Sequence, residues 1–178
     1  MQAEAHSLEF FFHEAVRNSY DGKLRLNDPE ITRYVARLLC DFSEPDNLFR
    51  LREATESTVE TFRVMVRAAD PVNGTAASFD VERSIRKYIG DYALFISGMY
   101  LDVVESGPNS EADRAILSEL IQVGKESYFI VSQFNLFEYK EDAPLFARLA
   151  ERFEHCILGL ALIREQLGDF KAPPSTVN

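Results

Sequence analysis

The sequence has no tryptophan, only two cysteines and three histidines, and no apolar run approaching the roughly 18 residues of a membrane span. Cys40 and Cys156 lie far apart, inside apolar helical patterns and outside any CxxC spacing. We therefore expect two reduced, buried thiols rather than a disulfide or a metal site. The first 16 residues have no basic segment ahead of their apolar residues, which argues against a secretory signal. These features together predict a cytoplasmic protein.

The usual signatures of enzymes are also missing. The chain has no Gly-x-Ser-x-Gly elbow, no Walker phosphate loop, no His-Glu-x-x-His and no strand followed by Gly-x-Gly-x-x-Gly. The chain therefore lacks the catalytic motifs that most common enzyme classes use. Their absence makes an enzyme less expected but does not exclude one.

Basic residues are scarce relative to acids, at 19 against 29, and the net charge is −10. The excess is spread evenly, with a net charge of −4 over residues 1–74 and −6 over residues 75–178. Such a surface repels phosphate backbones and anionic lipids. We expect neither nucleic acid nor a membrane as a partner.

Hydrophobic residues make up 46% of the 178 positions, which is enough for one globular core. Six segments carry apolar residues at helical spacing, and none sustains the alternation of a strand. The predicted helices cover residues 7–20, 29–42, 48–69, 79–104, 110–137 and 142–168. Short connections favour antiparallel neighbours. We predict an all-α, single-domain antiparallel bundle over residues 1–170, its last three helices long and central, and a flexible tail over 171–178.

The segment GDYALFISG lies in the middle of the fourth predicted helix. Gly90 and Gly98 each cost about 1 kcal/mol relative to alanine inside a helix. Close approach of a neighbouring helix would explain them, and Gly124 on the fifth helix is a natural partner. Alternatively, the missing side chains leave room for an apolar ligand. The wall of that pocket would comprise Tyr88, Tyr92, Tyr100 and Tyr128.

Asp91 is the one acid in the middle of this apolar helix. A carboxylate there needs a partner, and Lys87 can supply it from one turn earlier. Two interpretations stay open, a helix-surface or interhelical ion pair and a carboxylate that binds a ligand or handles a proton. The candidate ligand or partner contacts are Lys87, Tyr88, Asp91, Tyr92, Gly98 and Tyr128.

Two carboxylate and imidazole pairs invite a metal interpretation, Glu9 with His13 and Glu151 with His155. Di-metal bundles use Glu-x-x-His, whereas the spacing here is four residues, and Arg152 stands where the second glutamate should be. We therefore expect no metal and no cofactor. A di-metal oxidase remains a minor variant.

Four phenylalanines lie off the core stripes of their predicted helices: Phe10, Phe49, Phe129 and Phe137. Surplus apolar surface usually marks an interface. The leading hypothesis is a non-enzymatic protein that acts through protein contacts, as a homodimer. The alternative is a small-molecule binding protein or enzyme with a tyrosine-lined pocket near Asp91 and Gly98.

The segments GDYALFISG, GKESYFIVSQF and APLFARLAERFEHC resemble a family of uncharacterised bacterial all-helical proteins with a GDxALFxxG helix ahead of a Gly-x-x-x-Tyr helix. The resemblance covers about residues 80–160. It implies a helical, cytoplasmic bacterial protein and no assigned activity. The matching residues are Gly90, Asp91, Gly98, Gly124 and Tyr128, and the resemblance attaches no role to them.

Overall fold

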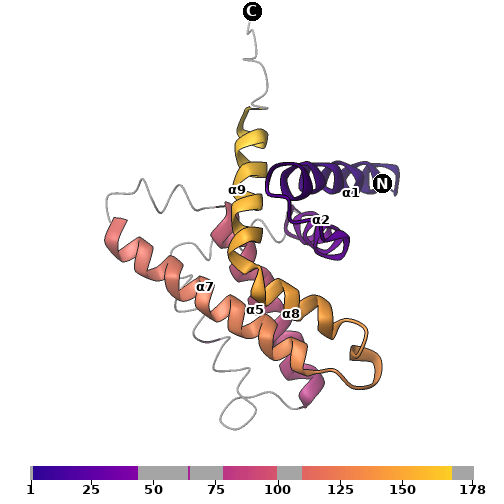
Figure 1. Cartoon of the computed structure of the whole chain (residues 1–178), viewed down its shortest axis with the longest axis vertical. Helices are drawn as coiled ribbons and strands as arrows, with labels where there is room; N and C mark the ends of the chain where they lie inside the picture. The colour runs from indigo at the N-terminus through magenta and orange to yellow at the C-terminus, as the bar shows by residue number, and fades with distance from the viewer. Residues whose placement is uncertain (1, 44–63, 65–77, 100–109, 170–178) are drawn as a thin grey trace, which may run out of the picture.

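The computed structural model describes residues 2–43, 64, 78–99 and 110–169, and all regular structure in these ranges is helical. The all-α prediction is confirmed (Figure 1). The elements are α1 (Gln2–Arg17), the π-helix η1 (Asn18–Lys23), α2 (Pro29–Ser43), α5 (Phe79–Met99), α7 (Ser110–Gln133), the 3-10 helix η2 (Phe137–Tyr139), α8 (Ala143–Glu151) and α9 (Phe153–Asp169). The predicted helix over 48–69, the tail over 171–178, Phe49 and Tyr100 lie outside the described residues.

The start of α2 follows directly from its sequence. Asp28 caps the helix, because its Oδ1 atom accepts hydrogen bonds from the backbone amides of Glu30 and Ile31, both at 3.2 Å. Pro29 occupies the first helical position, where no amide donor is needed. Although burial acts to raise it, hydrogen bonds from Arg148 and Ile31 keep the pKa of Asp28 below its usual range. The cap is therefore charged at neutral pH.

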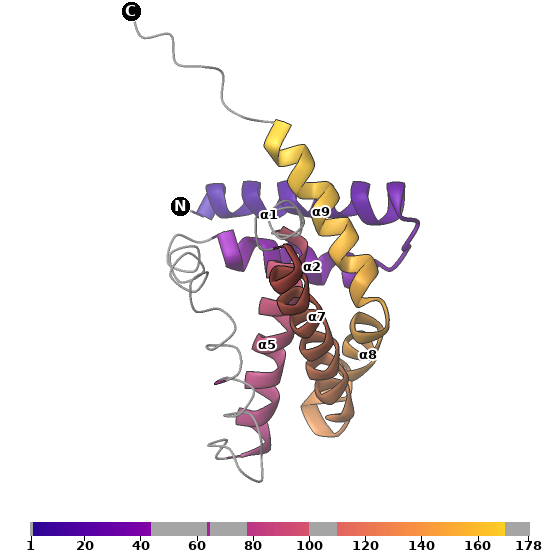
Figure 2. The ribbon, with the colours of Figure 1, turned by 90° about the vertical axis from the view of Figure 1, so that its left-hand side faces the viewer.

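Helices α5 and α7 run side by side in opposite directions (Figure 2). A Cβ atom at Gly90 would lie 2.4 Å from the Tyr128 ring, and one at Gly124 would lie 2.7 Å from the Cβ atom of Ala93. Higher numbers on α5 thus meet lower numbers on α7. The expected partnership of Gly124 with the small-residue face of the fourth predicted helix is confirmed.

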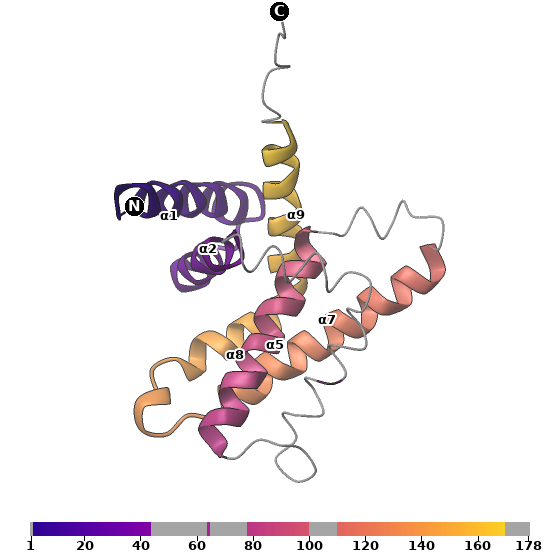
Figure 3. The ribbon, with the colours of Figure 1, turned by 180° about the vertical axis from the view of Figure 1, so that it is seen from behind.

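The single helix predicted over residues 142–168 is wrong, because the chain turns at Arg152. The Arg152 backbone leaves helical geometry (φ −105°, ψ 22°), and its side chain donates a hydrogen bond to the carbonyl of Leu26 at 3.2 Å. The turn lets α8 lie along α7 while α9 crosses towards α5 and η1 (Figures 1 and 3).

Two other predicted boundaries also differ. The first α-helix spans Gln2–Arg17 rather than 7–20, and the end of the predicted range belongs to η1. The helix that begins at Ser110 ends at Gln133 rather than Phe137, and η2 follows it.

The π-helix η1 fixes the first two helices to the rest of the molecule. Tyr20 is fully buried and donates a hydrogen bond to the carbonyl of Cys156 at 2.8 Å, while the Ser19 hydroxyl donates to the carbonyl of Gly159 at 2.9 Å. Gly159 is required, because a Cβ atom there would lie 1.9 Å from the Tyr20 ring. From this anchor, α1 and α2 extend to one side of the other helices as a hairpin (Figures 1 and 3).

Both cysteines are free, as expected. Cys156 is fully buried, and burial raises the pKa of its thiol to about 12. Cys40 is only partly buried, which corrects the prediction of two buried thiols. Among the described helices, none combines the length and the hydropathy needed to cross a bilayer.

Candidate functional site

Asp91 lies at the meeting point of three helices. Its Oδ1 atom accepts hydrogen bonds from the hydroxyl of Tyr128 on α7, at 2.7 Å, and from the hydroxyl of Tyr34 on α2. Lys87, one turn earlier on α5, donates to Oδ2 at 2.7 Å. The predicted ion pair with Lys87 is confirmed. Both tyrosine donors come from other elements, so the cluster ties α2, α5 and α7 together.

Gly90 explains how Tyr128 reaches this position. Because residue 90 has no side chain, the Tyr128 ring packs where a Cβ atom would otherwise stand, and its hydroxyl meets the carboxylate of the next residue. The adjacent residues thus act together: Gly90 makes room for the Tyr128 ring, and Asp91 accepts the hydrogen bond from its hydroxyl.

Burial and the charge of Asp91 keep Tyr34 and Tyr128 protonated. Burial, and then the nearby Asp91 charge, raise the pKa of Tyr34 and of Tyr128 well above the usual value. The Lys87 ammonium lies 5.2 Å from the centre of the Tyr34 ring, which adds a cation–π contact. The arrangement suits a stable interhelical connection, with each carboxylate oxygen engaged by a donor from the protein.

The other candidate residues lie in different surroundings. Tyr92 is buried and Tyr88 is half exposed, and both rings pack near Phe42 of α2, with centroid distances of 6.5 and 6.4 Å. Gly98 faces α9, where an added Cβ atom would lie 2.4 Å from the Cβ atom of Leu160. The prediction of close packing at Gly98 is confirmed. The space expected there for an apolar ligand is filled by Leu160.

A hollow of about 390 Å³ lies between α1 and α2. Its lining comprises Glu9, Phe10, His13, Arg33, Ala36 and Arg37. Glu9 approaches Arg37 at 3.9 Å, and Arg33 forms no ion pair with any described residue. Two arginines against one glutamate give the hollow a local positive charge on a strongly negative chain. Sequence reasoning missed this feature.

Metal ligation has no support in the described residues, which hold no group of three or more histidine, cysteine, aspartate or glutamate side chains placed to share an ion. Glu9 and His13 line the hollow, while Glu151 and His155 are exposed on α8 and α9.

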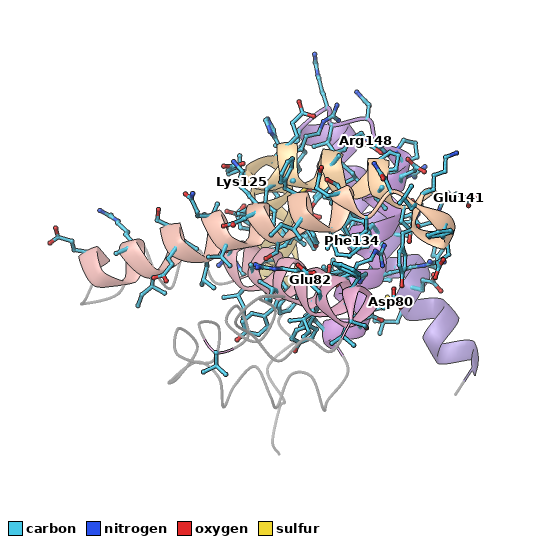
Figure 4. All side chains as sticks on the ribbon, turned by 90° about the horizontal axis from the view of Figure 1, so that it is seen from below. Asp80, Glu82, Lys125, Phe134, Glu141 and Arg148 are labelled. Carbon is cyan, nitrogen blue, oxygen red and sulfur yellow. The ribbon has the colours of Figure 1, made fainter. Side chains whose placement is uncertain are left out.

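The connection between α7 and α8 presents apolar side chains to solvent. Leu136 is 66% and Phe137 88% exposed. Tyr139 fixes this connection to α5, because its hydroxyl donates to Asp80 at 3.0 Å and its ring lies 4.0 Å from the Arg83 guanidinium carbon. Viewed from below, Asp80 and Glu141 lie on the side of the molecule where α7 leads into α8 (Figure 4).

Comparison with protein-family models, with curated proteins and with solved structures finds no match for this chain.

Proposed function

We propose that the chain is a non-enzymatic helical-bundle protein of the bacterial cytoplasm that acts through protein contacts, and that it forms a homodimer. The observation that supports this is the exposure of its off-core phenylalanines: Phe10 is 69%, Phe129 57% and Phe137 88% exposed. Exposed apolar side chains mark protein interfaces where they lie together in a patch.

The three phenylalanines belong to different elements and are not equivalent. Phe10 borders the hollow between α1 and α2, and Phe137 stands beside exposed Leu136. Phe129 is isolated, because its neighbours on the outer face of α7 are the exposed polar residues Gln122, Glu126 and Gln133. We therefore propose that Phe10 and Phe137 contact the second copy. Phe129 is exposed but takes no part in the interface.

Small-molecule binding near Asp91 has less support. Three protein donors engage the carboxylate, the Tyr128 ring fills the space at Gly90, and Leu160 fills the space at Gly98. A ligand would have to displace one of these donors to reach the carboxylate.

The test is sedimentation velocity of the full chain at low micromolar concentration, with Phe10→Ser, Phe137→Ser and Phe129→Ser variants in parallel. We expect two chains per particle for the native protein and for Phe129→Ser, and a shift towards one chain for the other two variants. A monomeric native protein would overturn the proposal. Native mass spectrometry of the same samples would reveal any retained small molecule and so test the alternative.

A further inference from the structure

Phe137 combines two unfavourable features at one position. Its φ angle is 52°, in the left-handed region that bulky side chains rarely adopt, and its side chain is 88% exposed. Strained backbone of this kind persists where the surroundings enforce it, and it concentrates at functional positions. The strain here serves to direct an aromatic ring outward.

The surroundings of Phe137 hold it firmly. Tyr139, two residues later, is fixed to Asp80 by its hydroxyl and to Arg83 by its ring. Arg83 is itself buried, lies 5.6 Å from the Phe146 ring, and donates to Asp142 at 3.4 Å. A rigid loop presents its apolar tip at a low entropic cost, which is the property of a preorganised contact.

Acidic residues surround this tip. The exposed acids of the connection and of the start of α5 are Asp80, Glu138, Glu141 and Asp142, against two bases, exposed Lys140 and the buried Arg83 that pairs with Asp142. We call Leu136, Phe137 and these acids the acidic tip. Its complement is an apolar recess with a basic rim.

The hollow between α1 and α2 has that chemistry. Phe10 and Ala36 supply apolar surface, while Arg33 and Arg37 supply positive charge. The hollow has a volume of about 390 Å³ and is open to solvent, so a side chain of another molecule can approach it. On a chain with a net charge of −10, a recess with excess positive charge is also where an acidic segment of another copy meets the least repulsion.

Building on the self-association proposed above, we propose that the acidic tip of one copy inserts Phe137 into the α1–α2 hollow of a second copy. The α1–α2 hairpin and the α7–α8 connection extend to the same side of the molecule (Figures 1 and 3). One two-fold axis can therefore exchange both contacts at once and close a dimer. The apolar tip provides the affinity, and the rim charges set the orientation.

Charge reversal tests this pairing, because reversing the charges of the tip should weaken the dimer, whereas general repulsion predicts that the less negative chain dimerises more tightly. Arg33→Glu with Arg37→Glu changes the net charge by four units, from −10 to −14, and Glu138→Lys with Glu141→Lys changes it by four units to −6. At low salt we expect each double variant to raise the dimer dissociation constant about tenfold or more, since like charges then face each other. The combined quadruple variant should return to within a few fold of the native value.

The matched control is Glu126→Lys with Glu151→Lys, which gives the same net charge of −6 from exposed acids outside the acidic tip. General repulsion predicts that this control and the Glu138, Glu141 variant both dimerise more tightly. If both do so, or if the quadruple variant fails to recover, the tip and the hollow are not partners, although the dimer itself would stand. A native chain that is monomeric throughout would overturn both proposals.

Discussion

At the scale of single residues, glycines set the distances between helices. Gly90, Gly98 and Gly124 all stand where a Cβ atom would come within 2.7 Å of a side chain on another helix. Each glycine makes its helix less stable by about 1 kcal/mol than alanine would. Close packing of α5 against α7 and α9 offsets this cost, because it buries apolar surface on both helices of each pair.

Gly98→Leu should lower the free energy of unfolding by about 3 kcal/mol, because the new side chain must displace Leu160 from a packed core. Gly168→Leu is the matched control, since nothing lies within 4 Å of a Cβ atom at this other helical glycine. The control should be neutral or slightly stabilising through helix propensity. Urea denaturation of both variants measures the difference, and equal stabilities would refute the account of close packing at Gly98.

The buried tyrosines predict a loss of stability in alkali. Burial comes first among the causes that raise the pKa of Tyr20, Tyr34 and Tyr128 well above 10 in the folded state. Above pH 10 the unfolded chain releases these protons while the folded chain keeps them, so the stability that the three tyrosines contribute is fully present below pH 10 and falls as the pH rises beyond it. The buried Cys156 thiol, whose pKa is raised to about 12, adds a loss of its own that begins near pH 9.

For three such groups the free energy of unfolding should fall by up to about 4 kcal/mol per pH unit above pH 10, or about 1.4 kcal/mol for each tyrosine. Urea denaturation at pH 9, 10 and 11 measures this slope. Tyr34→Phe should reduce it by its single share. A flat profile up to pH 11 would show that these hydroxyls are not held protonated by burial.

At the scale of elements, polar contacts add to the apolar packing and to the η1 anchor that hold the hairpin of α1 and α2 on the remaining helices. Tyr34 reaches Asp91 from α2, and Arg148 on α8 donates to Asp28 at 2.7 Å and also pairs with Glu30. These contacts orient the hollow relative to the α7–α8 connection.

Tyr34→Phe should therefore reduce the free energy of unfolding by about 1 to 2 kcal/mol, since a charged acceptor loses a donor. Amide hydrogen exchange should rise in α2 and remain unchanged in α8. Tyr88→Phe is the control, because Tyr88 is 45% exposed and its hydroxyl makes no hydrogen bond with the described residues. If Tyr88→Phe lowers the free energy of unfolding as much as Tyr34→Phe does, the loss does not come from the hydrogen bond to Asp91.

Elements defined by local signals could be predicted from the sequence, as α2 shows. The Asp28 cap, Pro29 and the apolar spacing act within a few residues of one another. The break at Arg152 could not be predicted, because no proline or glycine marks it. It accompanies a hydrogen bond to Leu26, which is 126 residues away along the chain.

The same distinction holds at the Asp91 cluster. Lys87 is one helical turn away and can be identified from spacing, whereas helical spacing places Tyr34 only on the apolar face of the predicted helix over 29–42. A tyrosine on a core stripe still needs a partner for its hydroxyl. That requirement could have linked it to the unpaired acid of the fourth predicted helix, but sequence spacing alone does not identify which helices meet.

At the scale of the whole molecule, the negative charge of the chain opposes self-association. Residues 1–43 carry seven acids and five bases, a net charge of −2, so the other residues carry −8. Per residue this charge is close to that of the rest of the chain, so the net charge of the hairpin does not select an orientation by itself. The remaining repulsion between chains of −10 acts over longer distances and is sensitive to salt.

Dimerisation should persist or strengthen as ionic strength rises from 0.1 M to 1 M. The Debye length falls from about 10 Å to about 3 Å over this range, which screens repulsion between the two chains, while the burial of Phe137 and Leu136 does not depend on such screening. Exposed rim pairs contribute only about 0 to 1 kcal/mol each, so their weakening is smaller than the gain. Sedimentation equilibrium across the salt series measures the dissociation constant. Dissociation at high salt would show that ion pairs carry the interface, and the apolar tip would then lose its assigned role.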